Sequence, residues 1–504
     1  MTRSKLGLAV AGALLLAGCG TTVPGSQQGT GPAAPGTTGL GGTAAGGTGT
    51  SGSVVGGTVP GSTSPRTGAA GTDGAPAGGS GSGSAPAAGT GASSAAAATT
   101  GARVTSPILL GYLGASSPAG VNAALGSSGG TSETPQDGVA YLVRQLNAHG
   151  GLAGRKITMV SDFIDPTSSS YETQAEAACA DFTQDHHVAA VLAQEDFYYS
   201  ENFSACLKKA NVPEIEAITG GVDSATLASY PMLYSVSAPT VERRFTAMIK
   251  GLTANGYLTK ANRIGIVVED CPYNVRAYGK AVGPAFAAHG LNVTKRTISC
   301  VHGFSDAASA IAAFQNAVLP FATAKVDRVM FMSGFESIGL QYFEQQAKQQ
   351  GYKPSYALTS TADAGENNAK LSDDELQRIQ GVGWEPDLDS LKLLPNSSAT
   401  QRCRSLFKGF TPAASRSNNR YNEMLCELFF SYEARLLKSN GHSDPGSIRA
   451  ASDALGTGYV SPLALTGATE YGPGRKDAPR LFAVFGYLKA CQCIGYTSGP
   501  KPLA

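Results

Sequence analysis

The sequence predicts an α/β fold of two doubly wound lobes, preceded by a leader and a long polar tether. Short apolar runs alternate with helical patterns from about residue 105 onward. These runs are mainly apolar and do not alternate with polar residues, which is typical of parallel strands covered by helices on both faces. The strands are also too many for one compact sheet, so we expect two sheets in two separate lobes.

The leader occupies residues 1–18. Two basic residues precede an apolar run that is too short to span a bilayer as a stable helix. The run ends in the tetrapeptide Leu16–Cys19, which resembles the lipobox of bacterial lipoproteins. This resemblance implies that Cys19 is acylated and anchors the mature chain to the extracytoplasmic face of the cell membrane. A plain secretory signal with an incidental cysteine is the alternative.

A tether follows at residues 19–104 and consists mainly of Gly, Thr, Ser, Ala and Pro. It has no aromatic residue, and after Cys19 its only charges are Arg66, Asp73 and Arg103. Such a segment cannot bury enough apolar surface to offset its chain entropy, so we expect disorder.

Charge excludes one class of partner. The formal net charge is +1 and no basic cluster occurs, so we expect no nucleic-acid partner. No run of 18 apolar residues follows Cys19, so we expect no further membrane span. No phosphate-binding loop or dinucleotide fingerprint occurs in the right context, and we expect no cofactor.

The chain has nine cysteines, and the eight after Cys19 form an even set, which in an exported chain argues for disulfides. Sequence neighbours favour Cys179 with Cys206, Cys271 with Cys300, and Cys403 with Cys426. Cys491 and Cys493 can pair in a tight ring or remain thiols. A zinc site is the rival interpretation, but the spacing lacks paired CxxC knuckles, and we expect no metal.

The predicted elements alternate along the chain. Helical spacing of Val139, Leu142, Val143 and Leu146 predicts a helix from Asp137 to His149, which Gly150 and Gly151 end. The other predicted helices lie at 172–184, 202–210, 273–289, 306–317 and 337–350. The predicted strands lie at 107–113, 156–160, 188–193, 214–218, 263–268, 326–332 and 355–359.

Ligands of such sheets bind beyond the carboxyl ends of the strands, and this rule selects the candidate site. The loop at 194–199 has the densest set of polar and aromatic residues, which suits a cationic or polyhydroxylated ligand; acids that merely face solvent are the alternative. The candidate ligand-binding residues are Ser116, Gln194, Glu195, Asp196, Phe197, Thr219, Gly220, Tyr273, Phe335, Glu336 and Asp363.

Four segments carry a resemblance to a known family. They are DGVAYLVRQLNAHGGLAGRKITMVSDF at 137–163, KKANVPEIEAITGG at 208–221, RIGIVVEDCPYNVRAYGKAV at 263–282 and FEQQAKQQGYKP at 343–354. From about residue 107 onward the chain resembles the type 1 periplasmic binding proteins, in particular the branched-chain amino-acid and amide binders of ABC importers.

The resemblance implies discontinuous lobes. Lobe one takes residues 105–238 and 383–470, lobe two takes 239–382 and 471–504, and three crossings form a hinge. It also implies a monomeric, lipid-anchored protein that captures a small polar ligand for ABC permease subunits. A sensor of the same fold and a cell-surface interaction module without a transport role are the alternatives.

Individual residues match the family pattern unevenly. Thr219 matches a hydroxyl and backbone position that holds the ligand, and Tyr273 matches a lid tyrosine. Glu336 or Asp363 matches an acid that holds an ammonium group. Glu195 and Asp196 stand where the amino-acid binders have a hydroxyl, and two carboxylates would repel a carboxylate ligand.

We expect no enzymatic activity. The segment Gly126–Gly130 matches GxSxG, but it lies far from the predicted strand and helix that a nucleophile elbow requires on either side.

Overall fold

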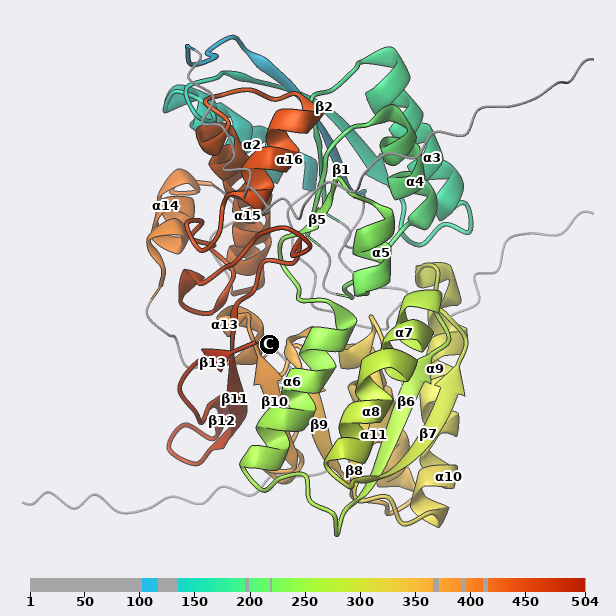
Figure 1. Cartoon of the computed structure of the whole chain (residues 1–504). Helices are drawn as coiled ribbons and strands as arrows, with labels where there is room; N and C mark the ends of the chain where they lie inside the picture. Colours follow the sequence, from blue (N-terminus) through green and yellow to red (C-terminus); the bar gives the residue numbers. More distant parts are fainter. Residues whose placement is uncertain are drawn as a thin grey trace, which may run out of the picture. The chain divides into compact units, whose positions relative to one another are not determined.

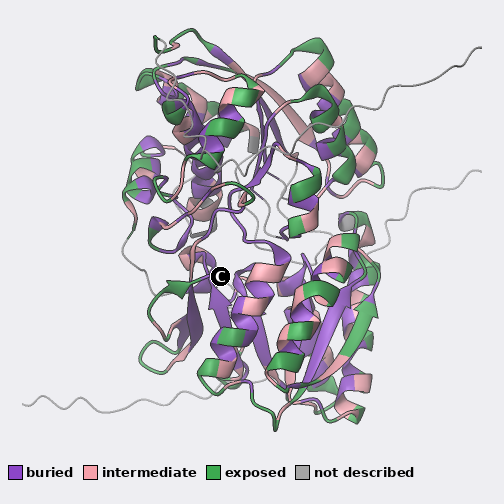
Figure 2. Ribbon diagram, in the orientation of Figure 1, coloured by how far each residue is buried: buried purple, intermediate pink, exposed green. Residues whose placement is uncertain are grey.

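The computed structural model describes residues 102–116, 135–194, 199–217, 220–365, 371–390, 396–410 and 416–503. These residues form two sheets with helices on both faces (Figure 1). Buried residues follow the strands and the inner faces of the helices (Figure 2). Among the described helices, none combines the length and apolarity that a membrane span requires.

Lobe one contains a parallel sheet in the order β2-β1-β3-β4-β5. Its strands are β1 (Ile108–Ala115), β2 (Ile157–Ile164), β3 (Val191–Ala193), β4 (Glu214–Glu216) and β5 (Leu233–Ser235). Its helices are α2 (Pro135–Ala148), α3 (Tyr171–Ala180), α4 (Glu201–Ala210), α5 (Ser224–Ser229), α14 (Ser398–Leu406), α15 (Arg416–Lys438) and α16 (Pro445–Asp453).

Lobe two contains a mixed sheet in the order β12-β11-β10-β9-β8-β6-β7, with β13 also paired to β11. The strands are β6 (Arg263–Glu269), β7 (Asn292–Ile298), β8 (Arg328–Met332), β9 (Ser355–Thr359), β10 (Ile379–Gly383), β11 (Leu481–Leu488), β12 (Cys493–Tyr496) and β13 (Lys501–Pro502). The helices are α6 (Val241–Ala254), α7 (Pro272–Ala277), α8 (Gly283–Ala288), α9 (Ala307–Asn316), α10 (Val318–Thr323), α11 (Glu336–Gln349), α12 (Asp373–Leu376) and α13 (Pro386–Asp389).

Helices cover opposite faces of each sheet. In lobe one, α2 and α15 share a core with Leu110 and Leu192, whereas α3 and α4 pack on the other face with Leu113 and Val191. In lobe two, α6 and α8 cover one face, and α9 and α11 cover the other. This doubly wound arrangement confirms the predicted fold class.

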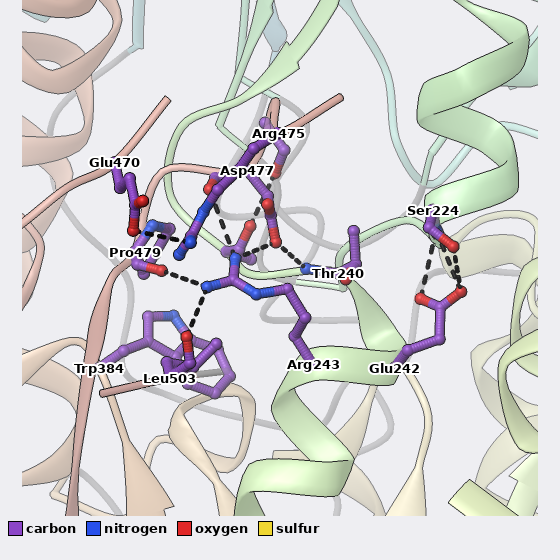
Figure 3. A network of polar contacts seen from close by, with 12 residues as sticks. Ser224, Thr240, Glu242, Arg243, Trp384, Glu470, Arg475, Asp477, Pro479 and Leu503 are labelled. Carbon is purple, nitrogen blue, oxygen red and sulfur yellow. Dashed lines mark hydrogen bonds and ion pairs between the residues drawn. The ribbon is translucent and has the colours of Figure 1, made fainter. Parts of the chain in front are cut away.

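The chain crosses between the lobes after β5, after β10 and before β11, which forms a three-strand hinge. Arg243, in the first turn of α6, contacts the last crossing and the segment after β13 (Figure 3). Its guanidinium pairs with Asp477 and donates to the carbonyl oxygens of Pro479 at 3.0 Å and Leu503 at 3.1 Å. The Thr240 N–H also donates to Asp477 Oδ2 at 2.8 Å. The carboxylate of Asp477 therefore joins the last crossing to Thr240 of the first crossing and to Arg243 of α6.

The segment that leads into the final crossing pairs with β5 of lobe one. Residues 476–478 extend the edge of lobe one, because Ser235 N donates to Lys476 O and Ala478 N donates to Ser235 O, both at 3.0 Å. We propose that lobe one continues to about residue 478, and that lobe two resumes with β11.

The eight cysteines of the folded part form four disulfides: Cys179–Cys206, Cys271–Cys300, Cys403–Cys426 and Cys491–Cys493. The first three are the pairings that sequence proximity favours. The fourth resolves the alternative that the sequence left open.

One predicted helix is divided. The pattern at 273–289 predicts a continuous helix, but α7 and α8 are separated by a π turn at Tyr278–Val282. Pro284 has no backbone N–H, so it cannot make the bond to residue 280 that an α-helix needs there. The Gly283 N–H donates to Tyr278 O, which widens the turn instead.

Candidate functional site

The first candidate element lies where β1 meets β3. The two strands are neighbours, and the helices that follow them cover opposite faces, so their carboxyl ends border a topological switch point. Tyr112 of β1 donates its hydroxyl to Gln194 Oε1, just after β3, at 2.8 Å. Both side chains are buried. Gln194 Nε2 has no hydrogen-bond partner among the described residues.

This bond fixes which way the carboxamide points. Because Gln194 Oε1 accepts from the hydroxyl, its NH₂ group is the half without a hydrogen-bond partner among the described residues. Gly114 makes room for the arrangement, since a Cβ there would lie 2.7 Å from the Tyr112 ring. Lobe one therefore presents a buried hydrogen-bond donor at its switch point.

Lobe two has a similar pair of polar side chains where β6 lies beside β8. Glu269, the last residue of β6, accepts from the hydroxyl of Ser333, just after β8. The same hydroxyl accepts from the Phe335 N–H at 2.8 Å, which fixes the start of α11. Each lobe thus has a buried pair of polar side chains across its switch point.

The carboxyl ends of the two sheets face one another near Arg244. This arginine lies one turn into α6, is 1% exposed, and donates to Thr361 Oγ1 beyond β9 at 3.1 Å. Gly221, in the loop after β4, has a φ of +67°. A Cβ at Gly221 would lie 3.5 Å from Arg244 Nη1 and 3.3 Å from Pro239 O. A residue with a side chain would be strained here by the left-handed backbone and would contact Pro239 O closely.

Two carboxyl groups of lobe two accompany this arginine. Burial raises the pKa of Glu269 to about 7, against the hydrogen bonds from Ser333 and Gly334 and the charge of Arg244. Burial likewise raises the pKa of Glu336 to about 7, although Thr359 donates to it through its backbone N–H at 2.9 Å and its hydroxyl. Near neutral pH both groups are poised between their charged and neutral forms.

Tyr273 and Asn274 follow β6 on α7. The Cys271–Cys300 disulfide ties this loop to the end of β7, which fixes where α7 begins. Burial and the charge of Glu269 raise the pKa of Tyr273, so its hydroxyl stays protonated. Asn274 is fully buried, and neither of its side-chain polar atoms has a hydrogen-bond partner among the described residues.

The structure describes only some of the predicted site residues. Glu195, Asp196, Phe197, Thr219 and Cys19 lie outside the described residues.

Gln194, Gly220, Tyr273 and Glu336 all belong to the facing ends of the two sheets. Ser116 follows β1, where its N–H donates to Ile164 O at 2.7 Å. Phe335 is buried in the hydrophobic core, which favours a packing role for its side chain.

Asp363 ends the short helix after β9. Its φ of +48° is left-handed, and its N–H donates to Ser360 O.

Sequence reasoning missed Tyr112, Arg244 and Asn274. Tyr112 lies within an apolar strand, and nothing in the sequence distinguishes it from a core residue. Arg244 could have been found from the sequence. It lies three residues after Val241 on the apolar face of α6, and burying a cation costs free energy unless a partner compensates its charge.

No family model matches the sequence, and no curated protein matches it.

Solved structures do match. An ABC-transporter solute-binding protein from R. palustris, in complex with 4-hydroxybenzoate, has a TM-score of 0.59 and 14% identity, covering 79% of this chain and 98% of its own. A substrate-binding protein from Desulfitobacterium hafniense, in complex with Leu, gives 0.54 and 14%, covering 77% and 99%. A leucine-binding protein from Thermotoga maritima gives 0.54 and 12%, covering 78% and 99%. The chain therefore has the fold of the type 1 periplasmic solute-binding proteins.

Proposed function

We propose that this protein captures a small polar solute between its lobes, outside the cytoplasm, and delivers it to an ABC importer. The observation that carries the proposal is the pair of switch points. Each holds a buried polar pair, Tyr112–Gln194 in lobe one and Glu269–Ser333 in lobe two. The likeness to transport receptors that bind 4-hydroxybenzoate and leucine supports the same conclusion.

The geometry favours a ligand with an oxygen acceptor at one end. Gln194 offers an NH₂ donor from lobe one, which suits a carbonyl or carboxylate oxygen. Arg244 contributes a buried positive charge between the sheets. Glu269 and Tyr273 contribute polar groups from lobe two, which suit a hydroxyl, amide or ammonium group. Amino acids, amides and hydroxylated aromatic acids all fit this description.

Capture requires hinge closure. A solute that touches both sheets stabilises the arrangement in which they approach, so binding selects the closed form. The chemistry stops at binding, and we propose no catalytic step. We also propose that the protein acts as a monomer and that Cys19 carries the lipid anchor.

The test begins with the purified full-length chain. Denaturing it should release the bound solute, which mass spectrometry identifies, and titration calorimetry with that compound should give saturable one-to-one binding. Gln194→Ala should weaken binding at least tenfold, whereas Arg296→Ala, on the exposed edge strand β7, should not. Absence of any released solute, or equal binding by the two variants, would contradict the proposal.

The anchor has its own test. Replacing Cys19 with Ser should move the protein from the membrane fraction to the soluble extracytoplasmic fraction. An unchanged distribution would show that another feature holds it at the membrane.

A further inference from the structure

The first turn of α5 is held by its own lobe. Asp223 precedes the helix, and its Oδ1 accepts from the Thr226 N–H at 2.8 Å and from the Thr226 hydroxyl at 2.6 Å. The helix packs on lobe one through Leu227 and Tyr230, which share a small core with Leu233 of β5. Asp223 is therefore a fixed point of lobe one, and it is fully buried.

A side chain of lobe two pairs with this fixed point. Arg276 of α7 donates from Nε to Asp223 Oδ2 at 2.7 Å and from Nη2 to Oδ1 at 2.9 Å. Its Nη2 also lies 3.0 Å from the Thr226 hydroxyl. This two-point geometry is the strong form of an arginine–carboxylate contact. The arginine side chain remains 39% exposed, so solvent partly screens the pair.

A second side chain of lobe two contacts the same turn. Glu242 of α6 accepts from the Ser224 N–H at 3.1 and 3.2 Å and from the Ser224 hydroxyl at 2.7 Å (Figure 3). A carboxylate beside the first N–H groups of a helix also meets the positive end of its dipole. Helices α6 and α7 of lobe two thus both form hydrogen bonds with the first turn of α5 in lobe one.

The pKa shifts of Asp223 and Arg276 indicate that both groups are charged. Burial alone would raise the pKa of Asp223, but hydrogen bonds from Arg276 and Thr226 hold it below its usual value. The hydrogen bond to Asp223 raises the pKa of Arg276. The pair therefore stays charged throughout the physiological pH range.

We propose that Asp223 and Arg276, with Glu242 and Ser224, form an interlobe latch that stabilises closure without contacting the solute. All the partner atoms belong to the protein, and separating the lobes would break the bonds that Arg276 and Glu242 make to Asp223, Ser224 and Thr226. Because solute binds the closed form, the latch sets the fraction of competent protein and hence the apparent affinity. This inference rests on the proposed function, since it assigns a regulator to the same cleft.

Removing the latch should change the ratio of closed to open protein. Losing a partly exposed, two-point ion pair should lower the closed-to-open ratio on the order of tenfold. Apparent affinity should fall by up to the same factor, whereas the contacts between protein and solute should be unchanged.

Small-angle X-ray scattering of the full-length protein, dialysed free of solute, tests the latch directly. Arg276→Gln should enlarge the radius of gyration relative to wild type. Asp223→Asn should do the same, because an asparagine still caps α5 but no longer attracts the arginine. The double variant should show no further expansion, since both changes remove one interaction. Arg296→Gln is the matched control and should scatter like wild type.

The outcomes separate the two proposals. If Arg276→Gln and Asp223→Asn scatter like wild type, the latch is overturned, whether or not a solute has been found. If they expand and no solute is ever released from wild type, the latch stands and the transport proposal fails. Circular dichroism should be unchanged in each variant; a variant that has lost its native spectrum is replaced by Glu242→Gln, which removes the second contact and should also expand the protein.

Discussion

The hydroxyl of Tyr112 donates to Gln194 Oε1 at 2.8 Å and joins the ends of two adjacent strands of lobe one. Neither residue belongs to a sequence motif. The bond orients the buried carboxamide of Gln194. Its NH₂ group is thereby available at the switch point between β1 and β3. A strand residue in the core thus decides which half of the Gln194 amide we propose to face the ligand.

Tyr112→Phe should weaken solute binding. The change leaves Gln194 Oε1 without its donor, so the amide can rotate and present the wrong atom. A lost hydrogen bond of this kind is worth about 1–2 kcal/mol, or roughly tenfold in the dissociation constant. Calorimetry with the released solute measures it.

The matched control is Tyr432→Phe. The Tyr432 hydroxyl is also buried in lobe one, but it has no hydrogen-bond partner among the described residues. Its removal should leave binding at the wild-type value. Equal affinities for the two variants would show that the Tyr112–Gln194 bond does not orient the site.

Stability should fall as pH rises from about 5 to 8. Burial raises the pKa of Glu269 and Glu336 from 4.5 to about 7, so the folded state binds more protons than the unfolded chain between these values. The unfolding free energy then decreases with pH through this window and levels off above it, by up to about 3 kcal/mol per group. Burial shifts other acids in the same direction: Glu214, Asp389, Glu423 and Glu427.

Thermal unfolding at pH 5.5 and pH 8 checks this sign. The wild-type midpoint should be several degrees higher at pH 5.5, and Glu336→Gln should reduce the difference because one titrating group is gone. A midpoint that increases toward pH 8 would contradict the burial of neutral carboxyl groups between the sheets.

Arg243→Ala should destabilise the hinge. Arg243 pairs with Asp477, which is 4% exposed, and donates to the carbonyl groups of Pro479 in the last crossing and of Leu503 after β13. Removing one partner of a largely buried pair leaves the other charge uncompensated and costs about 3 kcal/mol. The midpoint of urea denaturation measures the loss. Arg263→Ala, at an exposed strand end, should stay within about 0.5 kcal/mol of wild type.

The four disulfides should contribute unequally. Cys179 and Cys206 are 27 residues apart, and in the chain-entropy model their bond stabilises the fold by about 3.5 kcal/mol. Cys491 and Cys493 close a ring of only a few residues, so their bond restricts the unfolded chain much less. Replacing the first pair with Ala should lower the thermal midpoint by several degrees. Replacing the second pair should change it by little, and the reverse order would contradict the entropic explanation.

Much of the architecture can be predicted from local pattern. β9 is predicted residue for residue at 355–359, because Tyr356, Ala357 and Leu358 form the apolar centre of a buried parallel strand. β7 was not predicted, since as an edge strand it exposes Lys295, Arg296 and Thr297 and lacks such a run. The helix α15 also went unpredicted, although Met424, Leu425, Leu428 and Phe429 have helical spacing.

The site is predictable only in outline. The strand-end rule selects loops that lie at the carboxyl ends of the two sheets, since it depends on order along the chain. It cannot select partners that lie within a strand or on another element, such as Tyr112 for Gln194. The latch shows the same limit: Asp223 and Arg276 are 53 residues apart and meet only because the two lobes face each other.

A crystal structure of the protein with its released solute tests the central claim most directly. We expect the solute between the sheets, accepting a hydrogen bond from Gln194 Nε2 in lobe one and contacting Glu269 or Tyr273 in lobe two. A solute bound to one lobe alone, or at any place away from the carboxyl ends of both sheets, would contradict this account.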